Sequence, residues 1–139
     1  LAKEEGLAYS FTTEDIRDAH PNTARIHLRG ENGAECTIQG ASIGGGNILI
    51  TEIDGMEVSF TGQYNTLMVL HYDKPGTIAA VTNFMAYSGT NIGNFRLARK
   101  KKGGEAVMTI EVDGDVEESL IQSLRILPNV INVILIKAI

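Results

Sequence analysis

A histidine and an aspartate stand just ahead of a Pro-Gly step in the stretch HYDKPG, residues 71–76. His71 can exchange a hydrogen bond with a ligand, and Asp73 carries a negative charge that attracts an ammonium group. Pro75 suits the first turn of a helix, whose free N–H groups stabilise a carboxylate, and Gly76 lets a ligand approach the backbone closely. These residue types predict a site for a small charged ligand. A plain strand-to-helix turn with Asp73 near the cap position is the alternative.

A second polar junction, residues 88–91, follows the predicted helix and leads into the next strand. Its Asn91 offers both hydrogen-bond donors and an acceptor. We expect both junctions to be accessible at one end of the sheet, so that His71, Asp73 and Asn91 surround an amino acid. The histidine would face a carboxylate or hydroxyl, the aspartate an ammonium, and the amide either group. No nucleophile stands beside a base here, so the residues favour binding over catalysis.

The elements around these junctions predict an α+β fold. They run strand, helix, strand, strand, helix, strand at residues 67–72, 75–89, 91–99, 106–112, 116–127 and 130–139. This βαββαβ order is that of the ferredoxin-like plait.

Apolar side chains recur at helical spacing in both helices and predict two core stripes on one face of the sheet. The stripes are Ile78, Val81, Met85 and Ser88 with Phe84 beside them, and Val116, Leu120, Leu124 and Leu127. The sheet's other face is only partly apolar, since Thr109 and Glu111 alternate with apolar residues. Such a face commonly meets a second copy or another domain.

The first half of the chain predicts a partial, mainly antiparallel β domain. Residues 23–39 alternate apolar and polar side chains around Asn32-Gly33, and residues 47–60 flank Asp54-Gly55, two dipeptides that favour tight hairpin turns. Gly44, Gly45 and Gly46 indicate a bend between strands or a surface that meets a catalytic part. Residues 1–6 read as the end of a helix closed by Gly6. We therefore expect the start of this domain to lie upstream of Leu1.

The composition excludes several classes of protein. The 139 residues are 43% hydrophobic and 21% charged, without an apolar run long enough to span a membrane. Residues 1–65 carry 10 Asp and Glu against 4 Lys and Arg, which argues against nucleic-acid binding. The basic run at residues 99–102 reads as a solvated hairpin tip. The single Cys36 excludes an internal disulfide or a metal cluster held by this chain's cysteines, and a cytoplasmic setting is expected.

The pattern from His71 to Gly76, followed by Asn91 in Gly-Thr-Asn-Ile, resembles the ACT regulatory domain, most closely the serine-binding type of phosphoglycerate dehydrogenase. The resemblance implies that His71, Asp73 and Asn91 hold an effector amino acid, commonly across a dimer interface. Asp73 stands where that dehydrogenase has an asparagine, so its charge is expected to favour the ammonium and to change how the ligand sits. The implied effector site comprises His71, Asp73, Pro75, Gly76, Thr77, Asn91 and Ile92.

Three further segments widen the resemblance to the whole chain. HPNTA at residues 20–24, SIGGGNI at 42–48 and MTIEVD at 108–113 together resemble the beta chain of iron-sulfur-dependent L-serine dehydratase. In that family an allosteric-substrate-binding-like domain, here residues 1–62, precedes the ACT domain, here residues 66–139. The resemblance also implies an interface with the catalytic part at His20, Asn22, Gly44, Gly45, Gly46 and Asn47.

The same resemblance implies a regulatory fragment that is not catalytic alone. The family's Ser-Ser-Ser-His-Thr motif and its cluster cysteines do not occur in this sequence. A 4Fe-4S cluster would be held elsewhere, in a catalytic alpha chain or domain, and this chain itself is expected to hold neither cofactor nor metal. The expected partners are L-serine or a similar amino acid, the alpha chain, and a second copy through the ACT domain. Two alternatives stay open: an assembly module that binds no ligand, and the regulatory region of a phosphoglycerate dehydrogenase.

Overall fold

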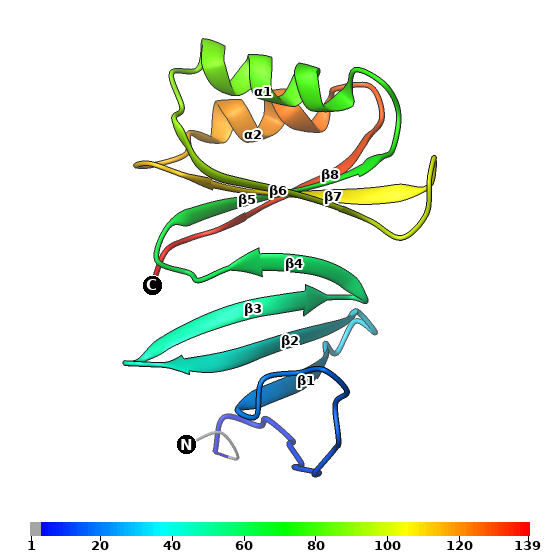
Figure 1. The fold of residues 1–139 in the computed structure, drawn as a ribbon, viewed down its shortest axis with the longest axis vertical. Coiled ribbons are helices and arrows are strands. Elements are labelled where there is room, and N and C mark those ends of the chain that lie inside the picture. Colours follow the sequence, from blue (N-terminus) through cyan, green and yellow to red (C-terminus); the bar gives the residue numbers. More distant parts are fainter. Residues whose placement is uncertain (1–3) are drawn as a thin grey trace.

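The computed structural model describes residues 4–139 as two four-stranded antiparallel sheets, the first with its strand β4 nearest to the second, and two helices on the outer face of the second (Figure 1). The first sheet has the order β1 (Thr23–Arg29), β2 (Glu35–Gly44), β3 (Asn47–Ile53), β4 (Met56–Phe60). The second has the order β6 (Ile92–Arg99), β7 (Glu105–Val112), β5 (Asn65–Tyr72), β8 (Val130–Ile136). Its helices are α1 (Thr77–Tyr87) and α2 (Glu118–Arg125).

The first sheet is built from the hairpins that the sequence predicts. Asp54 and Gly55 have φ of 49° and 74°, the left-handed conformation that a two-residue turn between β3 and β4 requires. The glycines 44–46 also have positive φ, and Gly44 pairs with Asn47 across the turn between β2 and β3. The predicted bend in this glycine run is therefore confirmed. Of the helix end predicted over residues 1–6, the first three residues lie outside the described part, and residues 4–6 form a turn.

The second sheet and its helices form the predicted ferredoxin-like plait, so the fold class is confirmed. Its core lies between the helices and one face of the sheet. The fully buried members come from three strands and both helices: Leu67, Val69, Val81, Met85, Met108, Ile110, Val112, Leu120, Ile121, Leu124 and Val133. Because the inward side chains of β5 and β7 share this face, His71, two residues beyond Val69, also points toward the helices.

Helix α1 departs from the prediction in two ways. It begins at Thr77, not at Pro75, because its N-cap residue Gly76 adopts a left-handed φ of 86° that interrupts the helical backbone. Its buried stripe is Thr77, Val81 and Met85, whereas Ile78 and Phe84, predicted as core, are 41% and 37% exposed. They flank the narrow stripe that faces the sheet. In α2 the predicted stripe is confirmed, since Leu120 and Leu124 are buried and the flanking apolar residues pack against the same core.

A second core joins the two sheets. Val58 and Phe60 of β4 pack against Met68 of β5 and Val107 of β7, on the face of the plait that the helices leave free. Glu111, on that same face, is buried and accepts hydrogen bonds from the Thr61 backbone N–H and the Asn94 side chain. Strand β4 of the chain's own first sheet thus packs on the partly polar face. The sequence had predicted that either a second copy or another domain would cover this face. No helix among residues 4–139 has the length and apolarity to cross a membrane.

Candidate functional site

His71 is the most unusual polar residue of the plait. It lies near the end of β5, where it pairs with Ala106 of β7, and only 1% of its surface is exposed. Its Nδ1 lies 2.9 Å from the Tyr72 carbonyl oxygen, which can only accept, so Nδ1 carries the proton of that bond. Nε2 is buried and has no partner among the described residues. In the neutral ring this nitrogen is an unsatisfied acceptor, and such buried atoms are rare in native proteins.

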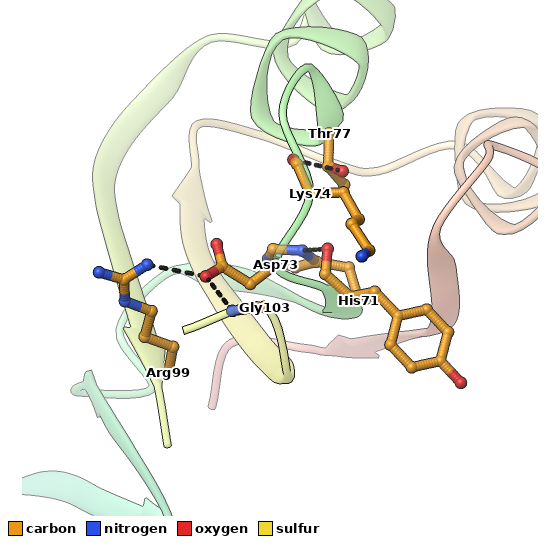
Figure 2. Close-up of polar contacts among 7 residues, drawn as sticks. His71, Asp73, Lys74, Thr77, Arg99 and Gly103 are labelled. Atoms are coloured by element: carbon orange, nitrogen blue, oxygen red, sulfur yellow. Dashed lines mark hydrogen bonds and ion pairs between the residues drawn. The ribbon is translucent and has the colours of Figure 1, made fainter. Parts of the chain in front are cut away.

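Asp73 is tied to the β6–β7 hairpin. Its Oδ2 accepts hydrogen bonds from Nη1 of Arg99 at 2.7 Å and from the backbone N–H of Gly103 at 3.0 Å. Figure 2 shows the carboxylate pointing toward these two residues, away from the start of α1. The Gly103 N–H and then the Arg99 guanidinium stabilise the ionised form and hold the pKa of Asp73 below its ordinary value of 3.8. Asp73 therefore anchors the hairpin, and the alternative in which it caps the helix is wrong.

The start of α1 beside these residues is open. Pro75 and Gly76 are exposed, and no side chain within residues 4–139 forms a capping hydrogen bond with the helix. Thr77 is buried, and its hydroxyl donates to the Lys74 carbonyl at 3.0 Å, which closes the loop between β5 and the helix. The Thr77 N–H also donates to the Lys74 carbonyl, so the positive end of the α1 dipole rather than this N–H would favour a negatively charged group at the exposed Pro75–Gly76 step.

Asn91 does not join His71 within one chain. Strands β5 and β6 both run antiparallel to β7, so they are parallel to each other, and Ile92 lies in the same row as Asn65, the first residue of β5. That row is about 20 Å from the row of His71, at about 3.3 Å per residue. The Asn91 side chain instead donates to Asp113 at 2.6 Å. The expectation that both junctions share one end of the sheet is wrong for a single copy.

Two residues at this site were missed by reasoning from the sequence. Arg99 and Gly103 belong to the basic run and its Gly-Gly turn, which form a hairpin tip as predicted. The strand register places this tip beside the β5–α1 loop, and the Asp73 N–H donates to Gly104 O at 2.7 Å. The sequence indicated only that these residues form a hairpin. It did not indicate their contact with Asp73, which lies 26 positions before Arg99.

The hairpin also reaches the first sheet. Nζ of Lys100 lies 3.3 Å from the Asp54 carbonyl oxygen in the β3–β4 turn, and Arg96 forms an ion pair with Glu57 of β4. Between these contacts is a cleft of about 310 Å³, lined by Gly55, Met56, Glu57 and residues 96–100. The loop that carries Asp73 is therefore connected through one hairpin to the first sheet.

The residues predicted to face a catalytic part gather at one end of the first sheet. The Asn22 carbonyl accepts a hydrogen bond from the Ser42 N–H, two residues before the turn formed by Gly44, Gly45 and Gly46. His20 is exposed, and its Nδ1 accepts from the Asn22 N–H at 3.1 Å. Asn47 closes the glycine turn. The segments that carry these residues therefore lie close together, whereas their contact with a catalytic part stays a prediction.

The plait is similar to a known family of domains in its sequence as well as its topology. Residues 67–132 match the model of the AHAS small subunit-like ACT domain. The βαββαβ order, with two helices on one face of the sheet, is consistent with this match.

The whole chain is similar to the beta chains of L-serine dehydratases. It is 43% identical over 133 residues to the probable L-serine dehydratase beta chain of Bacillus subtilis, covering 96% of this chain and 60% of that protein. It is 36% identical to the L-serine dehydratase beta chain of Peptoniphilus asaccharolyticus, covering 86% of this chain and 54% of that protein. These matches confirm the predicted resemblance.

A second family also matches over nearly the full chain. D-3-phosphoglycerate dehydrogenase of Bacillus subtilis is 26% identical over 136 residues, which cover 98% of this chain and 26% of the dehydrogenase. In all three comparisons the chain spans less than two thirds of the relative.

Proposed function

We propose that this chain is the regulatory part of an L-serine dehydratase, and that its ACT domain binds L-serine or a similar small amino acid as an effector. The observation that carries the proposal is the buried Nε2 of His71, which has no partner among residues 4–139, on a residue whose charge acts on Asp73. In this proposal residues 1–62 are part of an allosteric-substrate-binding-like domain. A catalytic alpha chain or domain supplies the reaction and holds the 4Fe-4S cluster.

An amino acid suits the chemistry of this site. Because Nδ1 of His71 donates to the Tyr72 carbonyl, Nε2 is the ring nitrogen left to accept a hydrogen bond from a ligand hydroxyl or ammonium group. Asp73 is ionised and attracts the ammonium group. The positive end of the α1 dipole favours the carboxylate. A small zwitterion with a hydroxyl would use all three features.

A second copy of the chain would complete the site. Strand β6 is the edge of its sheet, with Phe95 and Leu97 exposed on it. If two β6 edges pair antiparallel about a two-fold axis, the start of one strand lies beside the end of the other. Asn91 of one copy then approaches the end of β6 near His71 and Asp73 of the other. This arrangement supports a homodimer with two shared sites.

The route from this site to a catalytic part runs through the β6–β7 hairpin. A ligand that binds Asp73 contacts the same carboxylate that holds Arg99 and Gly103 of the hairpin, and the hairpin contacts the β3–β4 turn through Lys100. A ligand shifts an equilibrium only if it binds two states differently. A ligand whose affinity depends on whether Asp73 holds the hairpin supplies such a difference, and the first sheet would transmit it to the alpha chain.

Titration calorimetry on the chain tests the proposal. We expect millimolar L-serine to release or absorb heat with the unaltered chain, and His71→Ala to abolish that signal. His27→Ala is the matched control, because His27 is an exposed histidine of the first sheet whose ring forms a hydrogen bond with Thr37. Thermal melts of both variants establish that they fold. Absence of heat with L-serine, glycine and other small amino acids would refute effector binding.

Two other functions have a specific observation in their favour. The open β6 edge also suits an assembly module that binds no ligand, and this reading expects His71→Ala to leave both oligomer mass and any regulation by L-serine unchanged. The match to phosphoglycerate dehydrogenase over 98% of the chain suits the regulatory region of that enzyme. A dinucleotide-binding fingerprint upstream in the parent gene would decide for the dehydrogenase.

A further inference from the structure

We propose that Arg99 determines the specificity of this site by binding the ligand's carboxylate, while Asp73 holds Arg99 in place and binds the ligand's ammonium group. The inference rests on the proposed function and adds a residue that the family pattern did not supply. The Asp73–Arg99 pair would then select zwitterionic amino acids over ligands that carry only one charge.

Arg99 lies in the same row of the sheet as His71. It pairs with Ala106 on β7, and Ala106 pairs in turn with His71 on β5, so the three side chains point to the same face. Two strand spacings separate Arg99 from His71, about 10 Å in all. The residue between them is the small Ala106, and Asp73 reaches across from the β5–α1 loop (Figure 2).

The ion pair has unused binding capacity. Among residues 4–139, Asp73 is the one acceptor that contacts Arg99, and it engages only Nη1 of a guanidinium with five N–H donors. Asp73 uses only Oδ2 for its side-chain bonds, which leaves Oδ1 for a ligand. The two side chains are 52% and 22% exposed, so a ligand can reach both.

The charges match a zwitterion. An amino acid carries a carboxylate and an ammonium group on one carbon, and the site presents a guanidinium and a carboxylate side by side. Arginine binds a carboxylate through two parallel hydrogen bonds, which gives it geometric selectivity that a lysine lacks. Because the pair is open to solvent, a ligand can contact Oδ1 of Asp73 and the unused N–H groups of Arg99 without breaking it.

The place of Arg99 also fits entry from a dimer interface. It is the last residue of β6, the edge strand along which a second copy would pair in the proposed function. Arg96 lies three residues earlier on the same strand, but it pairs with Thr109 and forms its ion pair with Glu57 of the first sheet. Arg96 therefore serves as a matched control on the opposite face.

The test compares two ligands in titrations of Arg99→Gln and Arg96→Gln in the full chain. L-serine carries both charges, whereas ethanolamine lacks the carboxylate. We expect the unaltered chain to bind L-serine at least about tenfold more tightly than ethanolamine, the order expected from one charge-assisted contact. Arg99→Gln should lower the affinity for L-serine by about that factor and remove the preference, and Arg96→Gln should change neither. A loosened fold would weaken both ligands together, so the ratio isolates the carboxylate contact.

The outcomes separate the inference from the proposed function. If the unaltered chain binds L-serine and Arg99→Gln keeps the full preference, the inference fails and the proposed function stands. If the unaltered chain binds no amino acid, both the proposed function and the inference fail. If Arg99→Gln does not fold, Arg99→Lys replaces it, because lysine keeps the positive charge but cannot form two parallel hydrogen bonds with a carboxylate. Arg99→Lys should reduce the preference for L-serine over ethanolamine several-fold, and an unchanged preference would overturn the inference.

Discussion

The proposed sharing of one site between two copies makes a prediction that depends on strand topology. His71 and Asn91 of one chain lie at opposite ends of the plait, about 20 Å apart by strand register, which is far longer than L-serine. Each site of a dimer would therefore take His71 from one copy and Asn91 from the other. Placing His71→Ala and Asn91→Ala on different chains leaves one site with both residues intact and one with neither.

The expected magnitude follows from this symmetry. A mixed dimer with one substitution in each chain should bind L-serine with the unaltered affinity at about half the normal number of sites. Each substitution in a homodimer should remove binding from both sites. The mirror control is a dimer of one doubly substituted chain and one unaltered chain, in which both sites lose one residue, so binding should be absent. Co-expression with two different affinity tags isolates each mixed dimer, and titration calorimetry counts its sites.

The opposite pattern would refute the reasoning. A site contained in one chain predicts no binding when the substitutions are on different chains, and one intact site when they are on the same chain. An unaltered dimer that binds L-serine and gives this pattern would show that His71 and Asn91 of the same chain act together, contrary to the strand register.

Two predictions concern stability. Asp73→Asn should lower the melting temperature at about pH 7, because the carboxylate loses its charge-assisted bonds to Arg99 and Gly103. Since folding lowers the pKa of Asp73, its stabilisation is present above the ordinary value of 3.8 and is lost as the pH falls through the lowered pKa; melts at about pH 7 and about pH 3 should show the difference narrowing, and a constant difference would contradict this. Met85→Ala should reduce the free energy of unfolding by about 2 to 5 kcal/mol, because the side chain is fully buried. Ile78→Ala, on the exposed side of the same helix, should change it by no more than about 0.5 kcal/mol in urea titrations, and equal losses would place Ile78 in the core after all.

Much of the fold was predictable because it depends on neighbours along the chain. Asn32-Gly33 and Asp54-Gly55 mark turns that need positive φ, and both hairpins form around them. The period of two in the strands and the spacing of the apolar residues in α2 likewise report on faces that each element must bury. The order of these elements is that of the plait, and it required no knowledge of distant contacts.

The details of α1 were less predictable because they depend on the sheet beneath it. Pro75 before Gly76 is a common helix start, but Gly76 takes a left-handed conformation and delays the helix to Thr77. Ile78 and Phe84 fit an apolar stripe by spacing, yet the sheet covers only a narrower one. The width of a buried stripe is decided by what packs on the helix and cannot be read from the helix alone.

The candidate site divides along the same line. The types and spacing of His71, Asp73 and Pro75 pointed to a ligand at a strand-to-helix junction, because that chemistry is local. The partner of Asp73 is Arg99, 26 positions later, and it was found only through the pairing of β5, β7 and β6. The same pairing places Asn91 at the end of the sheet opposite to His71. Strand order and register arise from long-range packing, so tertiary structure decided which charged groups meet and which residue a second copy must supply.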